Sequence, residues 1–170
     1  MVAKLLFLVP TGLYVAAFLY ETYLSFARLD GRSAMKTSYV HATWEVTHTL
    51  LIFALIVLFM LHTSTIDKIA EQIFVPALLA GAALAVRSVL YTYLFYARVH
   101  KGTDWSDVSF ALSHVVSALF LVITAIKASD LLFNAGMPVN EQFLPWFVPG
   151  LVFVILICIV PITIIYKIKD

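Results

Sequence analysis

Long apolar runs separated by short clusters of charged residues dominate this chain. The runs cover approximately residues 5–27, 39–63, 73–97, 108–129 and 146–166. A helix needs about 20 mostly apolar residues to cross the hydrocarbon core of a bilayer, and each run is long enough. The pattern therefore predicts an all-α integral membrane protein with five transmembrane helices, forming a single membrane domain over residues 1–170.

Composition supports this class and excludes others. The chain is 62% apolar and only 12% charged, with a mean hydropathy of +0.98, which lies outside the range of soluble domains. A net charge of +1 argues against nucleic acid as a partner, and the sequence contains no glycine-rich phosphate loop. Its single cysteine, Cys158, excludes an internal disulfide, an all-cysteine cluster and a covalently attached haem.

The basic residues of the predicted loops are distributed unequally between the two sides of the membrane. With five spans, seven of them fall on one side and three on the other: Arg28, Arg32, Lys36, Arg98, Lys101, Lys167 and Lys169 against Lys4, Lys68 and Lys127. Short loops rich in lysine and arginine stay in the cytoplasm. We therefore expect a prokaryotic plasma-membrane protein with its N-terminus outside and its C-terminus inside.

Ionisable residues interrupt four of the five runs. The first contains Glu21, the second Glu45 and His48, the third Arg87 and the fourth His114. Such side chains almost always point into a bundle or a wet cavity. The fifth run has none, so we predict a four-helix bundle of the first four spans with one peripheral helix, whose apolar surface is available to another subunit.

The stretch "HATWEVTH", residues 41–48, raises the first question of chemistry. At about 100° per residue, His41, Glu45 and His48 fall within about 60° of one another on a helix. From the predicted membrane boundary, His48 lies about 13 Å deep and His114 about 10 Å deep. Two histidines at one level on different helices are what axial ligation of a b-type haem requires.

The haem hypothesis assigns further residues. Arg87 is predicted at a similar depth beside the cofactor, and Arg98 is available at the cytoplasmic rim for its propionates, together with Arg28 and Lys101. His41 lies near the interface, where we expect a solvated residue; the other interpretations make it an alternative ligand or a donor to a ligand. Tyr91 belongs to an aromatic group that forms either an interfacial belt or one wall of a quinone pocket.

Two other interpretations of these residues stay open. In the first, Glu21, Glu45 and Arg87 form a buried ion network, and the histidines bond to backbone carbonyls or neighbouring hydroxyls. In the second, the Glu-x-x-His sequence at 45–48 is half of a bundle metal motif, and a metal site combines Glu21, Glu45, His48 and His114.

The sequence thus leads to an expected function with an alternative. We expect a cytochrome b-type membrane subunit that transfers electrons and anchors a respiratory-type complex, with lipid, other membrane subunits and quinone as partners and with no catalytic residue of its own. The alternative is a cofactor-free accessory or scaffold subunit.

Overall fold

Five long helices make up most of the described chain. The computed structural model describes residues 2–29, 37–98, 103–133 and 138–167, without the side chains of 37–43, 132–133 and 160–167. The helices are α1 (Val2–Leu29), α2 (Thr37–Leu61), α3 (Ile66–Thr92), α4 (Trp105–Phe133) and α5 (Leu144–Lys167). Each is long and apolar enough to cross a membrane, which confirms the predicted fold class.

Three short helical segments complete the described elements. They are the 3-10 helices η1 (Thr63–Thr65) and η3 (Glu141–Phe143) and the π-helix η2 (Tyr93–Ala97), which continues α3. The N–H of Arg98 donates to the carbonyl of Tyr93 at 2.9 Å, the i to i−5 bond that defines a π-turn. The third span therefore ends in a wider turn than an α-helix provides.

The predicted boundaries are close to the observed ones except at the start of α3. This helix begins at Ile66 rather than at residue 73, so its first turns include Asp67, Lys68 and Glu71. Hydropathy marks only the segment suited to the hydrocarbon core, whereas a helix continues into water wherever its backbone bonds are satisfied. An acidic residue in the first turn also interacts favourably with the helix dipole.

The residues of α3 show how one helix serves two environments. Its buried positions recur at intervals of three, four or seven residues and so form one stripe: Ile69, Ile73, Pro76, Ala80, Arg87 and Tyr91. Large apolar side chains on the other faces are exposed, including Phe74 at 61% and Val89 at 69%. In a bilayer these exposed faces contact lipid.

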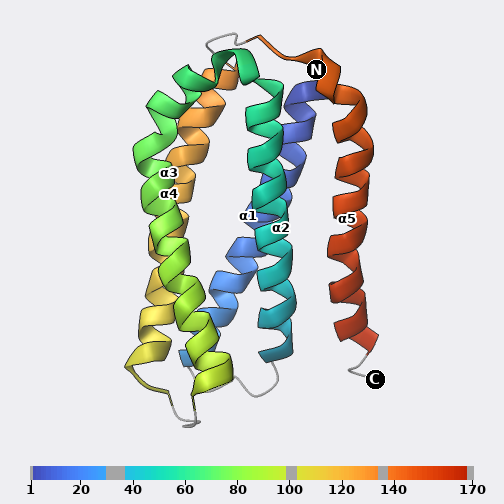
Figure 1. Ribbon diagram of the computed structural model, residues 1–170. Helices are drawn as coiled ribbons and strands as arrows, with labels where there is room; N and C mark the ends of the chain where they lie inside the picture. The colour runs from blue at the N-terminus through green and yellow to red at the C-terminus, as the bar shows by residue number, and fades with distance from the viewer. Residues whose placement is uncertain (1, 30–36, 99–102, 134–137, 168–170) are drawn as a thin grey trace. The chain divides into compact units, whose positions relative to one another are not determined.

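The chain folds as two compact units. The first contains residues 1–21, 35–66 and 137–170, and the second contains residues 22–34 and 67–136. In the first unit, α2 and α5 lie side by side (Figure 1), and Phe53 meets Phe147 edge-on with 6.3 Å between the ring centroids. Only 11% of the apolar window of α5 is buried, the smallest share among the five described spans, as expected for a peripheral helix.

In the same unit, the end of α2 is tied to the segment before α5. The His62 side chain, 5% exposed, donates from Nδ1 to the Pro138 carbonyl at 3.0 Å. Asn140 donates its backbone N–H to the Leu61 carbonyl at 2.7 Å and its side-chain amide to the Thr63 hydroxyl at 3.2 Å. These three bonds connect residues that are more than 70 positions apart in the sequence.

This junction predicts a pH dependence of stability. Burial lowers the pKa of His62 below its ordinary value, and the bond to Pro138 only partly opposes that shift. His62 therefore binds a proton more readily in the unfolded chain than in the folded one. Above about pH 6.5 this difference has no effect on the free energy of unfolding, and as the pH falls further it lowers that free energy. Thermal unfolding in detergent should show a smaller loss between pH 7.5 and 5 for His62→Gln than for wild type. Equal losses in the two proteins would contradict the predicted role of His62.

In the second unit, a reciprocal pair of bonds begins α4. Asp104 precedes the helix and accepts the backbone N–H of Ser106 at 2.8 Å, while Asp107 accepts the backbone N–H of Asp104 at 3.1 Å. This is the capping-box arrangement, made here by two aspartates in the sequence "DWSD". The cap fixes the Asp107 carboxylate at the first turn of α4.

Candidate functional site

His48 is held by one turn of α2. Its Nδ1 lies 2.8 Å from the carbonyl oxygen of Trp44, four residues earlier. The imidazole also packs against the Trp44 indole, with 4.3 Å between the ring centroids and a 41° tilt. Because a carbonyl oxygen only accepts, Nδ1 must carry the proton, and Nε2 is therefore the basic nitrogen of this ring.

His114 is held in the same way by α4 in the other unit. Its Nδ1 lies 2.9 Å from the carbonyl oxygen of Phe110, again four residues earlier. The Phe110 ring meets the imidazole edge-on, with 4.6 Å between centroids and an interplanar angle of 84°. Both His114 and Phe110 are buried, and the tautomer is again the one with a basic Nε2.

The hydroxyl residue before each histidine extends the similarity. Thr47 donates to the Trp44 carbonyl at 2.9 Å, and Ser113 donates to the Phe110 carbonyl at 2.7 Å. The sequences "WEVTH" and "FALSH" share an aromatic residue, two intervening positions, a hydroxyl residue and histidine. We call residues 44–48 and 110–114 the twin histidine turns. Sequence reasoning found both histidines but missed this five-residue pattern.

In each twin histidine turn, neighbouring residues fix the tautomer and the orientation of the imidazole. A backbone carbonyl fixes the tautomer, and an aromatic side chain restricts rotation of the ring. Metal-binding histidines commonly donate their second nitrogen to a carbonyl or carboxylate in this manner, which orients the ring and raises the basicity of the ligating nitrogen. The shared geometry suits these imidazoles to bind a metal. A histidine that only fills a helix interface can make the same carbonyl bond.

The first twin histidine turn also contacts a buried carboxylate. Glu21 of α1 is 1% exposed, and its Oε2 lies 3.1 Å from the hydroxyl of Thr47, which is equally buried. The predicted ion network paired Glu21 with charged residues and did not include this contact with a hydroxyl. The contact lies wholly within the first unit.

The other residues assigned from the sequence lie in different environments. Glu45 is exposed, because the buried face of α2 includes Val46, Thr47 and Leu50, and Glu45 falls beside that face. Arg87 is completely buried in α3. The side chain of His41 lies outside the described residues, as do His100 and Lys101.

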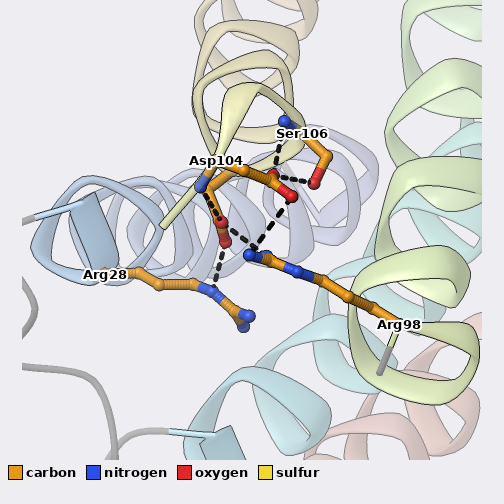
Figure 2. A network of polar contacts seen from close by, with 5 residues as sticks. Arg28, Arg98, Asp104 and Ser106 are labelled. Atoms are coloured by element: carbon orange, nitrogen blue, oxygen red, sulfur yellow. Dashed lines mark hydrogen bonds and ion pairs between the residues drawn. The ribbon is translucent and has the colours of Figure 1, made fainter. Parts of the chain in front are cut away.

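A compact ion network joins three helices of the second unit (Figure 2). The Asp107 carboxylate, 2% exposed, accepts Arg28 Nε at 2.7 Å through one oxygen and Arg98 Nη1 at 2.5 Å through the other. Arg98 Nη2 also lies 3.3 Å from Asp104. We call Arg28, Arg98, Asp104 and Asp107 the Asp107 network. Arg98, predicted to bind haem propionates, is thus committed to two carboxylates of its own chain.

Contacts within and beside this network shift the pKa values of Arg98 and Asp104, which lie outside the spans. The bond to Asp107 is the main factor that raises the pKa of Arg98, with further contributions from both aspartates. The hydroxyl of Ser106 is the main factor that lowers the pKa of Asp104. Arg98 and Asp104 therefore both stay charged at neutral pH.

Aromatic rings connect the Asp107 network to His114 within the second unit. The Arg28 guanidinium lies 4.7 Å from the centroid of Phe95, which in turn lies 6.3 Å from Phe110. Tyr91 is buried against both phenylalanines, at 4.8 and 6.4 Å. The predicted aromatic group therefore divides, since Tyr93 and Tyr96 are exposed at 46% and 72% and face outward as belt residues would.

The π-turn explains why Tyr91 has two partners on its own helix. In an α-helix, residue i+4 lies on the same face as residue i. In the wider π-turn, residues i+4 and i+5 both lie near that face. Phe95 and Tyr96 accordingly lie 4.8 and 6.3 Å from Tyr91.

Comparisons add no relative from which a function could be transferred. Among the described residues, no group of three or more His, Cys, Asp or Glu side chains is arranged to hold a metal ion. The chain matches no protein-family model, and searches of curated proteins and of solved structures return no significant match. Any function must therefore be argued from the residues themselves.

Proposed function

We propose that this protein is a membrane subunit that binds a b-type haem through His48 and His114 and transfers electrons within a respiratory-type complex. The twin histidine turns carry the proposal. Both imidazoles donate from Nδ1 to a backbone carbonyl, so Nε2 is the nitrogen through which each would ligate the iron.

The donor set fits this cofactor in its chemistry. Two neutral imidazoles form a ligand pair known for b-type haem, and a haem held there would supply one-electron transfer. Arg98 is a weak candidate for the propionates, because Asp107 and Asp104 already occupy its guanidinium. Quinone belongs to the proposal as a redox partner. Ser88, Val89, Thr92, Tyr93 and Ala97 line an open, mainly apolar hollow on α3 that offers a ring one place to lie.

A specific observation favours a second candidate, the cofactor-free scaffold subunit. Several residues considered for haem have structural partners inside the chain: Asp107 binds Arg28 and Arg98, and Phe110 packs against His114. Polar groups that satisfy one another in this way hold helices together in membranes without a cofactor.

An absorption spectrum separates the two candidates. The full chain, purified from membranes with haem supplied during expression, should show a Soret band and sharpened visible bands when dithionite reduces it. The metal content should be one iron per chain. A protein that is folded by circular dichroism and contains no haem would refute the cytochrome proposal and leave the scaffold.

A further inference from the structure

Ser117 of α4 is a buried hydroxyl residue that takes no bond from its own helix. The residue is completely buried, and its Oγ makes no hydrogen bond within the part of the chain that the structure describes. Ser113 and Thr124 of the same helix instead donate to carbonyls three and four residues earlier, at 2.7 and 2.8 Å. A buried hydroxyl is almost always hydrogen-bonded, so Ser117 needs a partner from elsewhere.

The face of α4 that includes Ser117 also contacts α3. Phe110 lies two helical turns before Ser117, so the two side chains leave the helix in nearly the same direction. The helices α3 and α4 lie side by side and run in opposite directions (Figure 1), and Phe110 meets Tyr91 of α3 with 6.4 Å between the ring centroids. Further along the same pair, Lys127 Nζ donates to the Gln72 carbonyl at 3.4 Å. These two contacts fix the register of the pair.

This register brings Arg87 to the level of Ser117. Arg87 lies one turn from Tyr91, about 6 Å along α3, and it is completely buried. Ser117 lies about 10 Å from Phe110 along α4, in the same direction because the helices are antiparallel. Side chains lean toward the N-terminus of their own helix, which for α3 is the direction of Ser117. The long arginine side chain therefore covers the remaining distance of about 4–5 Å.

Small residues and polar atoms make this place suitable for a water molecule. Ala83 lies one turn from Arg87 in the direction in which the guanidinium leans, and Ala80 is buried beside it. A buried water needs room for one molecule and two to four polar partners. The Ser117 hydroxyl can donate and accept, and a guanidinium has five N–H donors, so Arg87 can bond to a water while keeping its other contacts.

We propose that Ser117 and Arg87 bind an internal water molecule inside the second unit. The water gives the Ser117 hydroxyl the partner that its own helix does not supply. It also hydrates a guanidinium inside an apolar span, where an arginine is otherwise costly. The site needs no haem, so this inference is independent of the proposed function.

Magic-angle-spinning nuclear magnetic resonance of the full chain in lipid bilayers tests the site. Protein labelled with ¹⁵N-arginine should show polarisation transfer from water protons to the assigned guanidinium of Arg87. Ser117→Ala should weaken this transfer about fivefold, the factor that corresponds to one ordinary hydrogen bond. Ser117→Val places methyl groups at the site of the water and should abolish the transfer.

Two matched variants supply the controls. Ser113→Ala removes a buried hydroxyl of the same helix whose bond goes to a backbone carbonyl, so it should leave the water transfer to Arg87 unchanged. Ser117→Thr keeps the hydroxyl and should keep the transfer.

The sign of a stability change gives a second measurement. If a water satisfies the Ser117 hydroxyl, Ser117→Ala removes a hydrogen bond and should lower the Tm by about 2–4 °C. Removal of a hydroxyl that has no partner would instead raise the Tm. An unchanged or raised Tm in Ser117→Ala would overturn the site, as would no water transfer to Arg87 in wild type or transfer that persists in Ser117→Val. Absence of haem would refute the proposed function and leave each of these outcomes as it is.

Discussion

Asp107→Asn is expected to destabilise the folded protein by about 3–5 kcal/mol, the range for breaking a buried ion pair from one side. The carboxylate is 2% exposed and bonds to both Arg28 and Arg98, so its neutralisation leaves Arg98 beside the exposed Asp104 and removes the carboxylate that bonds to Arg28. Thermal or denaturant unfolding in detergent, followed by circular dichroism, measures the loss.

The neighbouring positions provide matched controls for this variant. Asp104→Ser keeps a side-chain oxygen for the cap of α4 and removes only an exposed charge, so it should cost much less. Arg98→Leu leaves Asp107 paired with Arg28 and should also cost less than Asp107→Asn. If Arg98→Leu is as damaging as Asp107→Asn, the carboxylate is not the centre of the network.

Replacing either His48 or His114 with alanine should abolish haem retention. Loss of a residue that only orients a ligand lowers metal affinity by about 10–100-fold, and removal of the ligand itself should exceed that. Reduced-minus-oxidised spectra of the purified variants, normalised to protein, give the measurement. His62→Ala and His41→Ala should keep most of their haem, because neither histidine is assigned to the iron.

The rival interpretations predict other results for the same proteins. A site built from Glu21, Glu45, His48 and His114 would make Glu45→Ala as damaging as His48→Ala and would give no Soret band in any variant. A scaffold would show no cofactor, and the histidine variants would then differ only in stability. Haem retained in both His48→Ala and His114→Ala would exclude this ligand pair.

The fold class followed directly from hydrophobic runs, because the bilayer imposes both length and polarity on a spanning helix. Helix ends followed less well, as the start of α3 at Ile66 shows. Apolar residues are required only within the hydrocarbon core, whereas the helix can continue beyond it.

The candidate site was predicted in its histidines and missed in its supporting contacts. Glu45 and His48 lie close in angle on α2, but the direction in which the helix faces its neighbours depends on packing, which leaves Glu45 exposed. Asp107 appeared in the sequence only as the edge of an apolar run, and its two arginines are 79 and 9 residues away. Pairing at such separations depends on tertiary structure. The shared pattern of the twin histidine turns is present in the sequence, but only their carbonyl bonds showed which positions to compare.

The Asp107 network also sets an order of events during synthesis. Arg28 leaves the ribosome 79 residues before its partner carboxylate, whereas Arg98 precedes it by only 9. The short loop between Arg98 and Asp107 closes at a smaller entropic cost, so the ends of α3 and α4 can join as soon as α4 begins. The last turn of α1 has no access to Asp107 until the fourth span is made. Assembly of the second unit therefore starts from α3 and α4, and the last turn of α1 is secured there afterwards.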